Sequence, residues 1–450
     1  MYKHLKNHIN RKIYPFHMPG HKANPIFLPL ELLSLDITEI PGMDVLSCPT
    51  GILKDMQDRI ASFYGADESL FLVNGSSAGV VAAVCYSSTI TDGTILIPRN
   101  AHASVYNWLA ISGAKPLYFM PEIMPNGLAG GVCPANEIFD NMPEGAAVLV
   151  VSPTYEGFVS DISAIAKRVH AKKGLLIVDE AHGAHFPFHE GFPSSAIENG
   201  ADISINSFHK TLPALSQTAV IHIKHARVNA EKLKFYVHAM QTSSPSYLLM
   251  ATTDYMLNLL WGNPSFFEDY YSRLIQLREA LYETSSALKL YGQNFVKGEN
   301  AVFDMDVSKL LFTLHDSDSA ETASEILAGK YGVQMEMANG QHILAMTSVA
   351  DTAEGFNRLK KAAAQYNMPP KNAKKTIEPI PVVFTIPDAA LTPHEAINRP
   401  SKVICREKSA GEISAELIAK YPPGIAITAP GERIHESVIP FLNRYVRVVD

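Results

Sequence analysis

Residues 174–185 read GLLIVDEAHGAH, a short apolar run that ends in an acidic residue, Asp179. Residues 202–211 read DISINSFHKT and carry a lysine, Lys210, just after a second run of this kind. Short runs rich in Val, Ile and Leu are typical of strands that are buried on both faces of a parallel sheet. The two stretches therefore predict buried strands that present polar side chains at their carboxyl ends.

Similar runs recur on both sides of this pair, between residues 66 and 225. We expect strands at 69–73, 94–98, 146–151, 174–178, 202–206 and 218–223. Segments in which apolar residues follow helical spacing lie between several of these runs, for example at 77–89 and 161–172. Strands that alternate with helices predict an α/β fold, in which helices cover both faces of a mostly parallel sheet.

The pattern changes after residue 225. From 226 to 290 it is helical, with a long stretch at 263–289, whereas 298–367 mixes strand-like and helical runs. The segment MPPKNAKKTIEPIP is rich in Pro and Lys and is typical of a linker. We expect an N-terminal segment at 1–65, a large domain at 66–290, a small α+β domain at 291–367, the linker at 368–381 and a C-terminal domain at 382–450.

The composition is that of a globular protein with more than one domain, because 450 residues exceed what one compact core usually supports. The net charge is −7 and no block of Lys and Arg occurs, so the chain lacks the charge pattern of a nucleic-acid-binding protein. The N-terminus lacks the apolar core of a signal peptide, and no run of about 18 apolar residues could cross a membrane. We therefore expect a cytoplasmic protein with no nucleic-acid or membrane partner.

Cysteine and histidine patterns argue against a metal site. The four cysteines lie far apart and form no CxxC motif, which is unlike a disulfide framework or a zinc site. Among the seventeen histidines, His182, His185 and His189 stand close together. No glutamate lies between two of them at the spacing that a zinc hydrolase uses, so we expect no metal.

A small-residue turn follows the first strand of the large domain. The run FLV at 71–73 leads into NGSSAG at 74–79, which includes Ser76 and Ser77, and then into a predicted helix. Small residues let backbone N–H groups approach an anion, and the N-terminus of the helix adds partial positive charge. The turn is therefore a candidate phosphate site, although a Gly-Ser turn that merely caps a helix has the same appearance.

The two strand ends carry the other chemical groups. An acidic side chain such as Asp179, at the carboxyl end of a buried parallel strand, needs a cationic partner, and the protonated pyridine nitrogen of pyridoxal phosphate (PLP) is one. Lys210, with Ser207 and His209 beside it, suits a lysine that forms a Schiff base next to a phosphate. Taken singly, Asp179 could just end a strand and Lys210 could be a solvated charge. In this order on one α/β core, the three motifs predict a PLP enzyme with the aspartate-aminotransferase fold.

Longer strings carry a resemblance to a family. They are PFHMPGHK at 15–22, DITEIPGMDVL at 36–46, FLVNGSSAG at 71–79, RNAHAS at 99–104, SPTYEG at 152–157, DEAHGAH at 179–185, SFHKTLPALSQTA at 207–219, QTSSPSYLLMA at 241–251 and YPPGIAITAPGE at 421–432. In this order the chain resembles the bacterial ornithine/lysine/arginine decarboxylases over nearly its whole length. It starts close to PFHMPGHK, so we expect it to lack the N-terminal wing domain of the large members. The stretch around RPSKVICREKSAGE matches the family poorly.

The resemblance implies roles for particular residues. Lys210 resembles the Schiff-base lysine, Asp179 the partner of the pyridine nitrogen, and His102 the imidazole stacked on the cofactor ring, although a lone histidine is more often a core residue. Ser76, Ser77, Ser207 and His209 resemble phosphate ligands. His182 stands beside the cofactor, where many relatives have tryptophan.

Three further residues are implied at the edges of the site. Thr242 and Ser244 match positions that reach the phosphate from a neighbouring subunit, which implies a homodimer or larger assembly with a shared active site. Glu432 resembles a residue that contacts the distal amino group of the substrate. No role follows for His17, His21 and Lys22, and anchoring of the N-terminus is the simplest interpretation.

The implied reaction is PLP-dependent removal of the α-carboxylate of lysine, arginine or ornithine as CO2, a step of polyamine biosynthesis. Which of the three amino acids is preferred does not follow from the sequence. Transamination or aldol cleavage on the same cofactor is an alternative, with Arg399, Arg406 or Arg433 as a possible clamp for the α-carboxylate. A non-catalytic regulatory relative is a further alternative, against which Lys210 and Asp179 argue.

Overall fold

The computed structural model describes most of the chain after its first forty residues. The described residues are 14–16, 26, 39, 43–90, 92–124, 127–284, 287–292, 295, 302–314, 319–366, 386, 388–420 and 424–450. His17, His21 and Lys22 lie outside this set, as does the predicted linker at 368–381.

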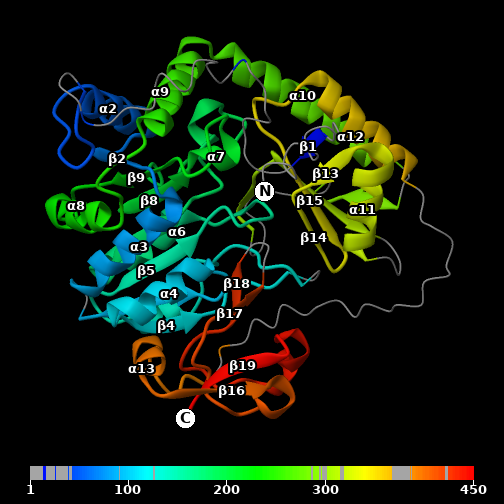
Figure 1. The fold of residues 1–450 in the computed structure, drawn as a ribbon. Coiled ribbons are helices and arrows are strands. Elements are labelled where there is room, and N and C mark those ends of the chain that lie inside the picture. Colours follow the sequence, from blue (N-terminus) through cyan, green and yellow to red (C-terminus); the bar gives the residue numbers. More distant parts are fainter. Residues whose placement is uncertain are drawn as a thin grey trace, which may run out of the picture.

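A seven-stranded sheet forms the centre of the large domain (Figure 1). Its order is β2 (Glu68–Leu72), β9 (Ala219–Ile223), β8 (Ile203–Ser207), β7 (Leu175–Asp179), β5 (Ala147–Val151), β3 (Thr94–Pro98) and β4 (Lys115–Phe119). The strands from β8 to β4 run parallel, and only β9 is antiparallel to its neighbours. All six predicted strands and the mostly parallel α/β sheet are confirmed.

One strand of this sheet was missed by sequence reasoning. The edge strand β4 reads KPLYF, and its side chains alternate between exposed and partly or fully buried. A sequence search for continuous apolar runs does not find such a strand, because only central parallel strands are buried on both faces. Edge strands also tolerate Lys and Pro, which central strands do not.

Helices cover both faces of this sheet. Alternate residues of β7 show the arrangement, because Ile177 packs in a cluster with α3 (Gly75–Ser88) and α4 (Ala103–Ser112), whereas Val178 packs with α6 (Ile162–Ala171). The helices predicted at 77–89 and 161–172 are therefore confirmed. Gly79 allows α3 to approach the sheet, since a Cβ atom there would lie 2.7 Å from Leu72 Cδ1.

The chain then leaves the large domain through three helices, α8 (Ala230–Ala239), α9 (Tyr247–Gly262) and α10 (Ser265–Tyr282). The last of these accounts for most of the long helix predicted at 263–289. A four-stranded sheet follows, ordered β10 (Leu288–Leu290), β12 (Lys309–Leu314), β15 (His342–Met346) and β14 (Met337–Asn339), with helices α11 (Ala320–Tyr331) and α12 (Ala353–Gln365). None of the described helices is long and apolar enough to cross a membrane.

The two ends of the chain pack on different parts of the molecule (Figure 1). Near the N-terminus, β1 (Tyr14–Phe16) pairs with β13 (Val333–Met335) beside the four-stranded sheet, and α2 (Ile52–Tyr64) packs against β2. The C-terminal part contains α13 (Pro393–Asn398), β16 (Ser401–Cys405), β17 (Ile418–Lys420), β18 (Ile425–Thr428) and β19 (Tyr445–Val449). It contacts the large domain where α13 packs against α4. The predicted domain boundaries stay predictions.

Short elements lie between the longer ones in the described part of the chain. Three are 3-10 helices, at Phe186–Phe188, Arg406–Lys408 and Glu436–Phe441. Four others are α5 (Ile138–Asn141), β6 (Phe158–Val159), α7 (Phe208–Thr211) and β11 (Asp304–Met305). The pair β6 and β11 links the large domain to the small one. The single turn α7 begins directly after β8, so it determines where the side chains of the SFHKT stretch point.

Candidate active site

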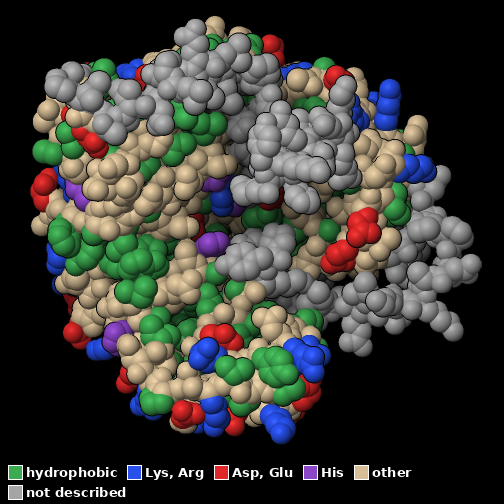
Figure 2. Space-filling model, in the orientation of Figure 1, with side chains coloured by type: hydrophobic (Ala, Val, Ile, Leu, Met, Phe, Trp, Pro, Cys, Tyr) green, Lys and Arg blue, Asp and Glu red, His purple; other side chains and the backbone are tan. Residues whose placement is uncertain are grey.

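A cavity of about 690 Å³ lies at the carboxyl ends of the parallel strands. Figure 2 shows a hollow near the centre of this face of the molecule, with histidine side chains at its rim. The volume is within the range of small-molecule sites, and the carboxyl edge of an α/β sheet is where such ligands bind. Residues from the large domain, the small domain and the C-terminal part line this cavity.

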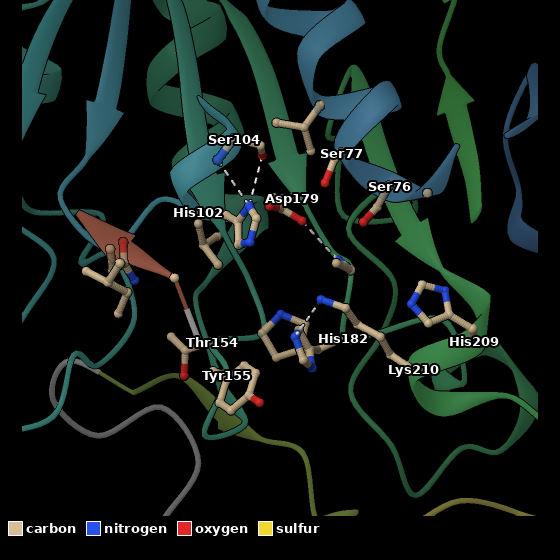
Figure 3. Close-up of a pocket in the computed structure, with 18 of the residues that line it drawn as sticks. Ser76, Ser77, His102, Ser104, Thr154, Tyr155, Asp179, His182, His209 and Lys210 are labelled. Carbon is tan, nitrogen blue, oxygen red and sulfur yellow. Dashed lines mark hydrogen bonds between the residues drawn. The ribbon is translucent and has the colours of Figure 1, made fainter. Parts of the chain in front are cut away.

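Lys210 projects into the cavity from α7 (Figure 3). Its Nζ lies 3.0 Å from Nε2 of His182, the histidine that follows the end of β7. Burial lowers the pKa of the Lys210 amine, and the negative charges of Asp179 and Glu336 offset only part of this effect. A lower pKa makes the neutral, nucleophilic form of the amine more accessible.

Asp179 and His102 lie on the same wall of the cavity (Figure 3). Asp179 is the last residue of β7 and is buried, with Oδ1 accepting a hydrogen bond of 3.2 Å from the Ala181 backbone N–H. His102 caps α4, and its Nδ1 accepts from the Ser104 N–H at 3.2 Å. In the neutral imidazole the ring proton is therefore on Nε2. Burial lowers the pKa of His102, while Asp179 raises it and Lys210 lowers it.

The turn with Ser76 and Ser77 lies on one side of Lys210, and Tyr155 lies on the other side (Figure 3). Gly75, Ser76 and Ser77 form the first turn of α3 and line the cavity. Asn74 does not cap this helix, because its Nδ2 donates instead to the Met240 carbonyl at 3.0 Å. The Gly75 N–H donates to the Gln217 carbonyl at 2.8 Å, so the N–H groups of Ser76 and Ser77 are the candidates for binding an anion in the cavity.

Two residues of the SFHKT stretch support this turn. Ser207 Oγ donates to Ser76 Oγ at 2.6 Å. His209 lines the cavity, and its Nδ1 donates to the Thr218 carbonyl at 3.1 Å. Ser207 thus contacts Ser76, and Figure 3 shows His209 near Ser76, while their roles as phosphate ligands stay predictions.

Family models match this chain over most of its length. The model for the Orn/Lys/Arg decarboxylase major domain matches residues 1–331, and the model for the C-terminal domain of that family matches residues 371–449. The chain belongs to the Orn/Lys/Arg decarboxylase family. It is therefore an amino acid decarboxylase, and the substrate class of the family is a basic amino acid.

Individual relatives agree with this assignment. An arginine decarboxylase from Bacillus anthracis is 31% identical over 453 residues, which cover 98% of this chain and 91% of the relative. The constitutive lysine decarboxylase of Escherichia coli has a TM-score of 0.78 at 19% identity, covering 97% of this chain and 79% of that one. A serine palmitoyltransferase from S. paucimobilis, solved with PLP and myriocin, has a TM-score of 0.57 at 13% identity, covering 78% and 86%. These structures confirm the predicted fold of PLP-dependent enzymes.

Four residues predicted for the decarboxylase site do not line its cavity. Ser207 is buried, and its side chain donates to Ser76, which does line the cavity. Thr242 and Ser244 are exposed, with the Ser244 N–H donating to Thr242 Oγ1 at 3.2 Å. Glu432 is buried, and its carboxylate pairs with Arg99, the Oε1–Nη1 distance being 2.5 Å. Glu432 Oε2 also accepts from the Ala429 N–H at 2.8 Å. The structure therefore gives Glu432 a partner within the protein and no contact with the cavity.

Other cavity residues were not found by sequence reasoning. Tyr155 and Glu156 belong to the SPTYEG string, and Glu336 lies in the small domain. The string itself was a signal, because it follows the buried strand β5 at the carboxyl edge of the sheet. Glu336 gave no comparable signal, since only the packing of the small domain brings it to the cavity.

Proposed function

We propose that this decarboxylase binds PLP in the cavity and uses it to decarboxylate a basic amino acid, with arginine as the first candidate substrate. The observation that supports this most is that Lys210 points into the same cavity as the first turn of α3 and the carboxylate of Asp179 (Figure 3). The Bacillus anthracis relative, which matches over nearly the whole chain, is named for arginine.

The residues of the cavity fit PLP in charge and position. The first turn of α3 with Ser76 and Ser77 suits the phosphate, and Asp179 suits the protonated ring nitrogen. His182 Nδ1 is buried and has no hydrogen-bond partner among the described residues, which is costly unless a bound group or water supplies one. We propose that Ser207, His209, His182 and His102 complete the cofactor site, with Lys210 as the covalent attachment.

The protein groups have separate tasks in the proposed reaction. When bound, PLP supplies an electron sink for the electron pair that remains after CO2 leaves. Asp179 holds the proton on the ring nitrogen, because a buried carboxylate stabilises a nearby positive charge. After CO2 is lost, the Cα atom needs a proton, and Lys210 Nζ and His102 Nε2 are the two candidate donors in the cavity.

The arginines considered for an aminotransferase reaction lie away from the cavity. Arg406 Nε lies 3.1 Å from Glu407, and Arg433 Nε lies 3.2 Å from Asp388. Arg399 is exposed at the end of α13. Their positions do not support a clamp for the α-carboxylate, so transamination has no structural argument in its favour.

The direct test is product analysis with three amino acids. Purified protein with PLP is incubated with arginine, lysine or ornithine, and CO2, amine and keto acid are measured together with the absorbance of bound cofactor. We expect one equivalent of CO2 for each amine formed, with arginine the best substrate. Keto acid in place of CO2 would show transamination, and a protein that binds no PLP would support a non-catalytic role.

We also propose a homodimer in which Thr242 and Ser244 contribute to the partner's site. Both residues are exposed, yet Gln241, which precedes them, is tied to β2, since its Oε1 accepts from the Val73 N–H at 2.8 Å. The segment is thus anchored near the phosphate turn while its polar side chains face outward. If sites are shared, Ser244→Arg should be inactive by itself, and mixing it with Lys210→Ala should restore CO2 release. If each chain has a complete site, Ser244→Arg stays active on its own.

A further inference from the structure

A tyrosine and a glutamate form a pair on the cavity wall near Lys210. Tyr155 Oη donates to Glu336 Oε1 at 2.5 Å, and both residues line the cavity. Tyr155 follows β5 of the large domain, whereas Glu336 lies between β13 and β14 of the small domain. The hydrogen bond therefore joins two domains across the cavity.

The local structure holds the Glu336 carboxylate in position. The Glu336 backbone N–H donates to the Leu344 carbonyl at 2.9 Å, so the residue is fixed against β15. Its neighbours Met335 and Met337 are buried, whereas Glu336 itself is only half-buried. Glu336 lies at the bend between β13 and β14, and its side chain lines the cavity.

Tyr155 also contacts His182, the neighbour of the reactive lysine. The Tyr155 ring lies edge-on to His182, with 5.0 Å between the ring centres, and His182 Nε2 lies 3.0 Å from Lys210 Nζ. Figure 3 shows Tyr155 on the far side of Lys210 from Ser76. A substrate whose α-amine reaches Lys210 can thus extend its side chain toward Glu336, away from the phosphate turn.

The cavity has three acidic side chains, and their surroundings assign them different roles. Asp179 is the proposed partner of the cofactor ring. Glu156 is fully buried, and burial raises its pKa, which favours the neutral acid. Glu336 is half-buried, and its hydrogen bond with Tyr155 holds it at the cavity wall. Glu336 is therefore the cavity carboxylate best placed to meet a cation.

We propose that Glu336, positioned by Tyr155, binds the distal cationic group of the substrate side chain. This inference rests on the proposed decarboxylase function and names the residue that selects basic amino acids. It also replaces the role that the family resemblance implied for Glu432. The carboxylate of Glu432 is already paired with Arg99 and lies off the cavity. A carboxylate that pairs with the substrate cation discriminates against neutral side chains, because these cannot form the ion pair.

The test compares a basic substrate with its neutral analogue. The pairs are arginine with citrulline, lysine with norleucine, and ornithine with norvaline, used according to the preference of the wild-type protein. In Glu336→Gln we expect kcat/KM for the basic amino acid to fall on the order of 10²-fold, mainly through KM, because a charge pair with the substrate is lost. The rate with the neutral analogue should stay within a few-fold of wild type.

Controls separate this result from general damage and from failure of the proposed function. A merely structural role for Glu336 would lower both rates equally, and the cofactor absorbance of Glu336→Gln should match wild type. Calorimetry with the product amine gives a readout without turnover, and its affinity should fall by a similar factor. If an active Glu336→Gln protein keeps the wild-type ratio of kcat/KM for the basic amino acid and its neutral analogue, this inference is overturned but the proposed function is not. No CO2 from wild-type protein would instead overturn the proposed function.

Discussion

Lys210→Ala is expected to lower CO2 release on the order of 10³-fold or more, because the variant loses both the covalent attachment of PLP and a proton donor. The lowered pKa of Lys210 in its partly buried position supports a reactive amine. The measurement is the rate of CO2 release from the preferred amino acid at saturating PLP. Asp179, His102 and the phosphate turn remain in place, so the variant should still bind some cofactor without covalent attachment.

Lys210→Arg is the matched control for charge. It keeps a cation next to Asp179 and His182 but has no primary amine, so we expect activity as low as in Lys210→Ala. Activity that survives in the arginine variant would mean that only the charge at this position matters. Such a result would remove Lys210 from the role proposed here.

Breaking the Arg99–Glu432 pair is expected to have the largest effect on stability. Both side chains are about 1% exposed, and the pair joins the end of β3 to the C-terminal part. Glu432→Gln leaves the Arg99 cation buried without its counter-charge, which costs about 3–5 kcal/mol in comparable cases. The measurement is the urea midpoint of unfolding, which should fall clearly below that of wild type.

A double variant shows whether the loss of stability comes from the unpaired charge or from the changed shape of the side chain. Arg99→Met with Glu432→Leu removes both charges, so its midpoint should lie closer to wild type than that of either single variant. The fraction of Glu432→Gln protein that is still folded should keep the wild-type ratio of kcat/KM for arginine and citrulline. A stable Glu432→Gln protein with a raised KM would instead support the substrate contact that the family resemblance implied.

The sequence was sufficient for six of the seven strands of the central sheet and for the motifs of Ser76, Asp179 and Lys210 at its carboxyl edge. The strand that contains Asp179 is an apolar run, which is typical of a strand buried on both faces. The strand before Lys210 reads ISINS, and its polar residues are buried together with its isoleucines. Ser76 and Ser77 were found because the chain passes directly from a strand into a helix through small residues. In each case the chemistry and the local structure come from the same short stretch.

The remaining parts of the site depend on tertiary packing. Glu336 reaches the cavity only because β13 and β14 of the small domain pack against the loop that carries Tyr155. Glu432 carries the motif that suggests substrate contact, yet Arg99, more than three hundred residues earlier in the chain, pairs with it. No local pattern distinguishes a carboxylate that faces a cavity from one that is paired within the protein, because the partner is set by long-range contacts.

The central claim is that PLP attaches to Lys210, and mapping the attachment site tests it most directly. Wild-type protein with PLP is reduced with borohydride, digested, and searched by mass spectrometry for a peptide that carries the reduced cofactor. The account predicts the label on Lys210 in the SFHKT stretch and none on this peptide in Lys210→Ala. A label on another lysine, such as the buried Lys309, or no label at all in a protein that releases CO2, would contradict it.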